Sequence, residues 1–109
     1  LTPTANRRAF VRELSRAMSQ AERYGTPASV VYFDIDSFKD INDSHGHAAG
    51  HAALLHVVDI VMRHIRDTDI VGRLGGGEFG VILSHADEAT TMEKAEALVS
   101  DIRTTPLNW

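Results

Sequence analysis

Residues 70–83 read Ile-Val-Gly-Arg-Leu-Gly-Gly-Gly-Glu-Phe-Gly-Val-Ile-Leu, a pattern that predicts two strands joined by a short turn. Two apolar runs, Ile70 to Leu74 and Phe79 to Leu83, flank a turn formed by residues 75–78. A connection this short favours an antiparallel hairpin, and glycine permits the positive φ angles that a tight turn needs. Exposed amides in such a turn can receive phosphate oxygens, with Glu78 beside them as a cation ligand or a hydrogen-bond acceptor. By itself, however, Gly-Gly-Gly is more typical of a flexible hairpin.

A second apolar run, residues 28–33, ends on two acids, Asp34 and Asp36. Its composition suits a strand covered on both faces, and ligands of α/β sheets tend to lie beyond the carboxyl ends of strands. Two carboxylates there suit a hard cation such as magnesium or manganese. Two alternatives stay open: the acids face solvent or cap a turn, or they begin a haloacid-dehalogenase-type phosphatase site. Phe38 weakens the second, because that site has Thr or Val there.

Three helices are expected around these strands. Asn6 is a plausible N-cap of a helix that runs to about Tyr24. A turn is expected at residues 42–46, then a long helix, and after the hairpin a third helix that Pro106 ends. The apolar stripes of the last two helices are Leu54, Val58, Val61 and Ile65, widened by Leu55 and Met62, and then Met92, Ala95, Val99 and Ile102. This order predicts an α/β sandwich with a mixed sheet that is short of strands.

Composition limits the functional classes. With 109 residues and 43% apolar content, the chain can form one modest core and one domain. The formal charge of -4 argues against a nucleic-acid partner, and the lack of Cys excludes disulfides and thiolate metal sites. The lack of Cys also fits a reducing compartment, so we expect a cytoplasmic protein. No apolar run approaches the roughly 18 residues of a membrane span. Because the chain begins at Leu1 without Met, we interpret it as an excerpt of a longer protein.

Several stretches together resemble the GGDEF family of diguanylate cyclases in wording, order and spacing. They are Phe-Asp-Ile-Asp-Ser-Phe-Lys-Asp-Ile-Asn-Asp at residues 33–43, Gly46-His47 with Gly50, and Arg-Leu-Gly-Gly-Gly-Glu-Phe at residues 73–79. Residues 1–10 also look like the family's opening motif, so the resemblance covers residues 1–109 as a partial GGDEF domain. It implies a nucleotidyl-cyclase-like fold, incomplete at the C-terminus.

The resemblance also implies an activity and partners. In the family, two GTP molecules on facing subunits condense to cyclic di-GMP and release pyrophosphate. We therefore expect GTP or cyclic di-GMP as ligand, a homodimer, and fusion to other sensory or output domains. Direct membrane contact from this segment is not expected.

Carried over residue by residue, the resemblance implies a nucleotide site with magnesium. Asp34 and the backbone carbonyl of Ile35 would bind the metal, while Glu78 and Lys39 would be the catalytic residues, Lys39 meeting the triphosphate. The implied substrate contacts are Phe38, Lys39, Asn42, His51, Gly75 and Gly76.

Two positions of this site depart from the family. Gly77 stands where the motif has Asp or Glu, and His51 stands where an Asp would recognise guanine. An imidazole cannot offer the two acceptor oxygens of a carboxylate, and losing a hydrogen bond to a charged group weakens binding by about tenfold or more. The sequence thus predicts a regulatory module with little or no cyclase activity. A working cyclase and a structural dimerisation domain remain as alternatives.

Arg66-Asp67-Thr68-Asp69 lies where many family members carry an inhibitory site for the product. Arg66 could contact the phosphate or guanine of cyclic di-GMP, and Asp69 could accept from the guanine. The alternative is an exposed helix end with a loop acid. His47 and His51, four residues apart, could also bind zinc, which is less favoured because no carboxylate lies between them in the metalloprotease manner.

Overall fold

The computed structural model describes residues 5–35 and 38–104, and its elements follow the predicted order with one further helix at residues 38–45. The described elements are α1 (Arg7–Tyr24), β1 (Ala28–Asp34), α2 (Phe38–His45), α3 (His47–His64), β2 (Ile70–Gly75), β3 (Glu78–Ser84) and α4 (Glu88–Thr104). The Asn6 side chain accepts from the Ala9 amide at 2.8 Å and so caps α1 as predicted. Gly25 ends that helix in a left-handed conformation with φ of 67°.

The sheet has the strand order β1-β3-β2, and both strand pairs are antiparallel. The predicted hairpin of β2 and β3 is therefore confirmed. Within the described residues, parallel pairing occurs at the isolated bridge between Ala5 and Gly72. The register places Asp34 opposite Glu78 at one end of β1 and β3, and Ala28 opposite Ser84 at the other.

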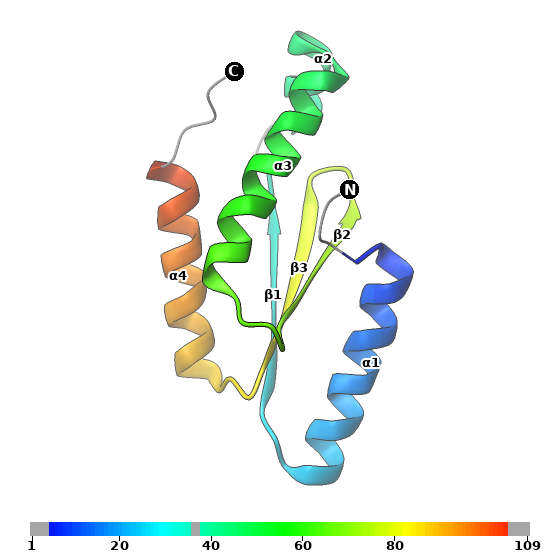
Figure 1. The fold of residues 1–109 in the computed structure, drawn as a ribbon, viewed down its shortest axis with the longest axis vertical. Helices are drawn as coiled ribbons and strands as arrows, with labels where there is room; N and C mark the ends of the chain where they lie inside the picture. The colour runs from blue at the N-terminus through cyan, green and yellow to red at the C-terminus, as the bar shows by residue number, and fades with distance from the viewer. Residues whose placement is uncertain (1–4, 36–37, 105–109) are drawn as a thin grey trace.

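Helices cover both faces of the sheet, which confirms the predicted α/β sandwich (Figure 1). On one face, the Phe10 ring of α1 lies over two glycines that oppose each other in the register, Gly72 and Gly80. A Cβ atom at either glycine would lie 2.6 Å from that ring, so only glycine fits beneath it. The other face packs against α3 and α4, where Val57, Val61 and Leu98 meet Phe79 and Val81.

The predicted turn at residues 42–46 is wrong, because residues 38–45 form the helix α2. Asn42 and Asp43 are common turn residues, and they obscured the helical spacing of Phe38 and Ile41. The chain changes direction only at Gly46, which has φ of 88°.

The apolar stripes also extend less far than predicted. Leu55 and Met62, expected to widen the stripe of α3, are both 41% exposed, because the buried face centres on Leu54, Val58 and Val61. Met92 and Val99 of α4 are likewise exposed. Pro106 and Trp109 lie outside the described residues. None of the helices in residues 5–35 and 38–104 has the length and apolar character needed to cross a membrane.

Candidate functional site

Two acids face each other at the hairpin end of the sheet. Asp34 ends β1 and Glu78 begins β3, directly opposite in the register, and both are exposed. Opposite residues of an antiparallel pair share one face of the sheet, with Cβ atoms about 5 Å apart. Beside them lies an open groove of about 410 Å³, which is large enough for a small molecule. Its lining is Arg7, Tyr32, Phe33, Asp34, Leu74, Glu78 and Phe79.

Arginines hold the backbone of the glycine turn in place. Gly76 has φ of 47°, which a residue with a side chain rarely adopts. The guanidinium of Arg7 donates to the Leu74 carbonyl at 3.1 Å, and that of Arg73 donates to the Gly76 carbonyl at 2.9 Å. The carbonyls on both sides of Gly75 are thus held by cations from α1 and β2.

Gly77 is buried against the loop that follows β1. Its carbonyl accepts from the Ile35 amide at 2.9 Å, and the Ile35 carbonyl in turn accepts from the Phe38 amide at 3.2 Å. A Cβ atom at position 77 would lie 2.9 Å from Cβ of Phe38 and 3.2 Å from Cβ of Ile35. The motif position that is expected to hold an acid therefore has no carboxylate and little room for one.

The predicted guanine contacts lie on α2 and α3, which follow each other in the chain. The half-buried Asn42 side chain lies on Gly50, where an added Cβ would approach Oδ1 to 1.8 Å. His51 follows Gly50 and is exposed, as is Lys39 in the first turn of α2. Asn42 thus packs against the residue that precedes His51, and position 51 carries an imidazole in place of a carboxylate.

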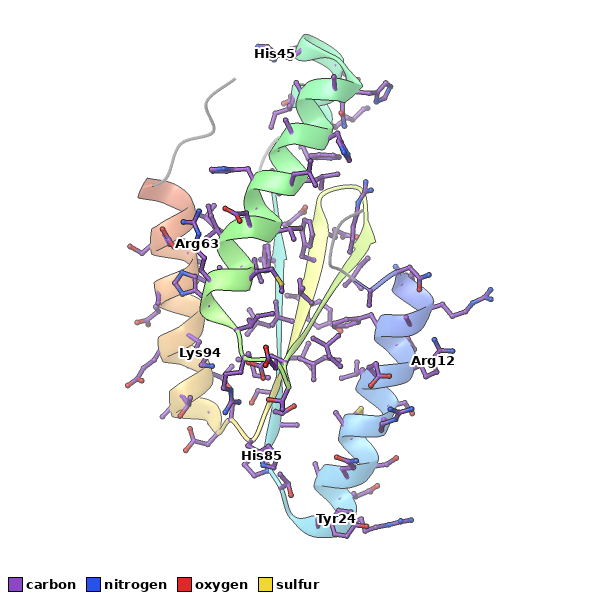
Figure 2. All side chains as sticks on the ribbon, viewed as in Figure 1. Arg12, Tyr24, His45, Arg63, His85 and Lys94 are labelled. Atoms are coloured by element: carbon purple, nitrogen blue, oxygen red, sulfur yellow. The ribbon has the colours of Figure 1, made fainter. Side chains whose placement is uncertain are left out.

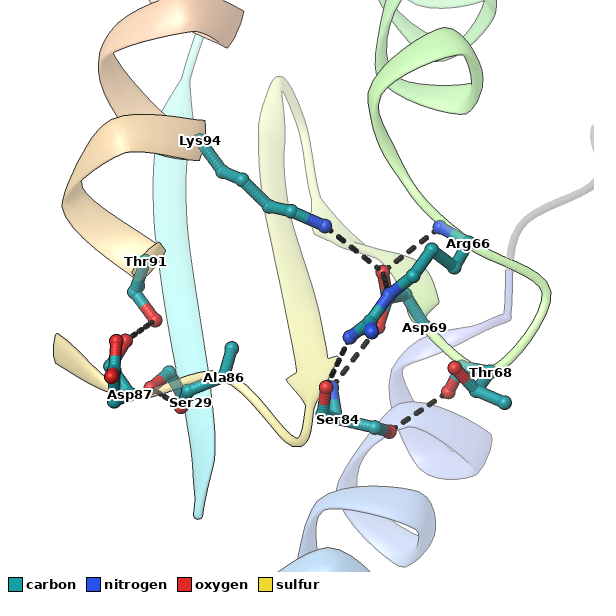
Figure 3. A network of polar contacts seen from close by, with 9 residues as sticks. All are labelled: Ser29, Arg66, Thr68, Asp69, Ser84, Ala86, Asp87, Thr91 and Lys94. Atoms are coloured by element: carbon teal, nitrogen blue, oxygen red, sulfur yellow. Dashed lines mark hydrogen bonds and ion pairs between the residues drawn. The ribbon is translucent and has the colours of Figure 1, made fainter. Parts of the chain in front are cut away.

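Arg66 and Asp69 lie at the opposite end of the sheet (Figure 3). The Asp69 side chain is 0% exposed and accepts from the Arg66 amide at 2.9 Å and the Ser84 amide at 3.0 Å. Lys94 of α4 places Nζ 3.8 Å from the same carboxylate. The Arg66 guanidinium, which is 51% exposed, contacts Asp69 at 3.4 Å and donates to the Ser84 carbonyl.

The pKa of Asp69 lies below its ordinary value of 3.8. Burial by itself would raise this pKa, but the hydrogen bonds from the Arg66 and Ser84 amides and the Arg66 guanidinium outweigh it. Asp69 is therefore a charged carboxylate that is bound within the chain, and Arg66 is the member of this pair that solvent reaches.

Comparisons with known proteins identify the family. The family model described as "Diguanylate cyclase, GGDEF domain" matches residues 1–108. The chain is similar to diguanylate cyclase DosC of Escherichia coli, with 39% identity over 107 residues, or 98% of this chain and 23% of that protein. It also resembles the solved GGDEF domain of TpbB from Pseudomonas aeruginosa, with a TM-score of 0.87, 36% identity, and coverage of 94% of this chain and 60% of that one.

The chain belongs to the GGDEF family. Its fold also matches the GGDEF domain of DgcB from Caulobacter crescentus in complex with c-di-GMP, with a TM-score of 0.84 and 34% identity over 89% of this chain and 57% of that one. It is thus a GGDEF domain of cyclic di-GMP signalling. The chain spans less than a quarter of the length of DosC and under two thirds of the TpbB domain.

Magnesium is the usual cation of GGDEF cyclases, and the residues at the hairpin end suit it in part. Two carboxylates and a backbone carbonyl are hard oxygen donors. However, no group of three or more acids, histidines or cysteines could hold a metal among the described residues. A zinc ion bound by His47 and His51 would accordingly have no third protein ligand among the described residues. Gly77 is the position at which the GGDEF motif would supply a further acid.

The structure groups the predicted residues in three places. Asp34, Ile35, Phe38, Gly75, Gly76, Gly77 and Glu78 lie at the hairpin end; Lys39, Asn42 and His51 lie on α2 and α3; Arg66 and Asp69 lie at the far end. Asp36 lies outside the described residues. Sequence reasoning missed Arg7, which reaches the groove from α1, and Lys94, which reaches Asp69 from α4. No local pattern signals either contact, since each joins residues that are far apart in the sequence.

Proposed function

We propose that this chain is a degenerate GGDEF domain that binds GTP or cyclic di-GMP as a regulatory module and has little or no cyclase activity. The observation that carries the proposal is the environment of Gly77. This motif position is buried against Phe38 and Ile35 and has no carboxylate.

The remaining residues support nucleotide binding better than catalysis. When bound, magnesium would neutralise the triphosphate, and the Asp34 carboxylate, the Ile35 carbonyl and Glu78 would hold it. Lys39 at the start of α2 would meet the triphosphate, beside the backbone of Phe38, and Gly75 and Gly76 would let the substrate lie against the hairpin. Attack of a 3'-hydroxyl on the α-phosphorus needs more, because the transition state develops charge that fixed ligands must stabilise. The missing acid at position 77 removes that support.

Base recognition is weakened in the same way. Asn42 keeps an amide that can pair with guanine, whereas the exposed imidazole of His51 offers at most one acceptor. We therefore expect GTP to bind less selectively than it would to a carboxylate at position 51.

The second ligand site of the proposal is the pair Arg66 and Asp69. Asp69 is bound within the chain, so we assign the ligand contact to the exposed Arg66 guanidinium and a positioning function to Asp69. A planar guanidinium suits the phosphates and guanine edges of cyclic di-GMP. The C. crescentus relative in complex with c-di-GMP supports this ligand class.

The proposal includes the wider setting of the domain. We place it in the cytoplasm, where GTP is available, as a homodimer fused to sensory or output domains. An active cyclase is the second candidate, because the relatives are named diguanylate cyclases and Asp34 still faces Glu78. A purely structural dimerisation domain is the third.

Three measurements on the full-length protein separate these candidates. GTP with magnesium and, separately, cyclic di-GMP are titrated by calorimetry; the GTP mixture is then assayed for product by chromatography; and self-association is followed by analytical ultracentrifugation. Saturable binding without turnover supports the regulatory module, and turnover supports the cyclase. Self-association without binding of GTP or cyclic di-GMP supports the scaffold and would overturn the proposal.

A further inference from the structure

The groove beside Asp34 and Glu78 contains one cation that the proposed function does not use. Arg7 is the first residue of α1, and its side chain crosses to the hairpin, where Nη1 donates to the Leu74 carbonyl at 3.1 Å. The same groove of about 410 Å³ is lined by Arg7 and by both acids. An arginine and two acids, brought together from three elements, thus share one open surface.

The guanidinium of Arg7 keeps donors available for a ligand. It has five N–H groups, and its hydrogen bond to Leu74 uses one of them. The ion pairs found among the described residues involve other basic residues, and neither Asp34 nor Glu78 forms an ion pair with Arg7 there. The bond to Leu74 also restrains the side chain, so a ligand would meet a guanidinium that is already oriented.

We propose that Arg7 binds a terminal phosphate of the nucleotide whose metal is held by Asp34 and Glu78; this inference rests on the proposed function. Two carboxylates beside one guanidinium make the groove negative, which repels a free triphosphate. A divalent cation on the acids reverses that sign and brings the phosphates within reach of the guanidinium. Arg7 is therefore a ligand for the phosphate chain of a metal-bound nucleotide.

A purely structural function of Arg7 makes a different prediction. If Arg7 only fixes the Leu74 carbonyl, its loss would loosen the hairpin and weaken the binding of every nucleotide to the same extent. If Arg7 binds a terminal phosphate, its loss should weaken the binding of GTP much more than that of GMP, which has a single phosphate. Lysine at position 7 would keep the charge but lose the planar fork, so it should fall between the parent and alanine.

The test is calorimetric titration of the full-length protein with GTP and with GMP, each with magnesium, for the parent, Arg7→Ala and Arg7→Lys. The matched control is Arg12→Ala, since Arg12 extends from the same helix on the side away from the sheet (Figure 2). Arg7→Ala should weaken GTP binding by about tenfold or more and GMP binding by much less, whereas Arg12→Ala should change neither. Thermal melting checks that each variant is folded. If Arg7→Ala is not folded, the binding of GTP and GMP by Arg7→Lys is compared with that by the parent instead.

Inorganic triphosphate with magnesium separates this inference from the proposed function, because it contains no base. If the parent fails to bind GTP but binds triphosphate through Arg7, the assignment of GTP is wrong and the phosphate site stands. Equal weakening of GTP and GMP by Arg7→Ala, or an unchanged GTP affinity, would overturn the inference. So would a parent protein that binds neither GTP nor triphosphate.

Discussion

Asp34 and Glu78 lie directly opposite each other across β1 and β3, so two strands place a carboxylate each at one end of the sheet. This pair remains although the neighbouring motif position is Gly77. In the proposed function, this pair provides oxygen donors for magnesium.

Asp34→Asn should therefore lower the magnesium-dependent affinity for GTP. The change keeps the shape of the side chain but removes its charge, and we expect a loss of about tenfold. Calorimetric titration with magnesium, repeated with a chelator, measures the dependence. Asp59→Asn on the outer surface of α3 is the control, since Asp59 pairs with Arg63 away from the groove. If Asp34→Asn binds magnesium and GTP as tightly as the parent, Asp34 is not a magnesium ligand.

Asp69 should make the stability of the domain depend on acid pH. Because its pKa is lower in the folded state than in the unfolded chain, its ionised form contributes stability above the ordinary value of 3.8. That contribution is lost as the pH falls through the lowered folded pKa. Asp69→Asn should lower the free energy of unfolding by about 1–3 kcal/mol near neutral pH. It should also make the free energy of unfolding depend less on pH in the acid range. Urea unfolding at a series of pH values measures this dependence. The control is Asp67→Asn, because Asp67 is an exposed neighbour. If the free energy of unfolding changes with pH equally for the parent and Asp69→Asn, the prediction is wrong.

Arg66 should bind cyclic di-GMP through the geometry of its guanidinium. Arg66→Lys is then expected to weaken binding nearly as much as Arg66→Ala, because lysine keeps the charge but loses the fork. Calorimetry at moderate salt is the appropriate measurement, since loose charge attraction is screened. Arg63→Ala, one helical turn earlier, serves as the control. If Arg66→Ala binds cyclic di-GMP as tightly as the parent, residues 66–69 have only the structural function of connecting α3, β3 and α4.

Local signals in the sequence predicted much of this fold, whereas the site depends on contacts between distant residues. The hairpin around Gly76 and the cap at Asn6 follow from a few adjacent residues each, and both are confirmed. The helix α2 was missed because turn-forming residues occupy an apolar helical spacing. The bonds from Arg7 to Leu74 and from Lys94 to Asp69 depend on how α1 and α4 pack, and no local pattern contains that information.

Restoring the missing acid should require more than one substitution. Gly77→Asp alone should recover little activity, while Gly77→Asp with His51→Asp should recover more, because neighbouring functional groups act non-additively. Gly77→Asp should also lower the melting temperature, since its Cβ would lie 2.9 Å from Cβ of Phe38. Chromatography of GTP reactions and thermal melting measure the two effects. Equal rescue by the single substitution would show that His51 does not limit catalysis.

In the proposed function, the cyclase chemistry is lost while the fold and the ligand-binding surface remain. The most direct measurement is the amount of cyclic di-GMP that the unmodified full-length protein forms from GTP and magnesium, with DosC of E. coli as the positive control. We predict no product above background from this protein under conditions in which DosC is active. Product at a rate typical of enzymes, about one per second or faster, would contradict the claim and show that Gly77 does not abolish catalysis.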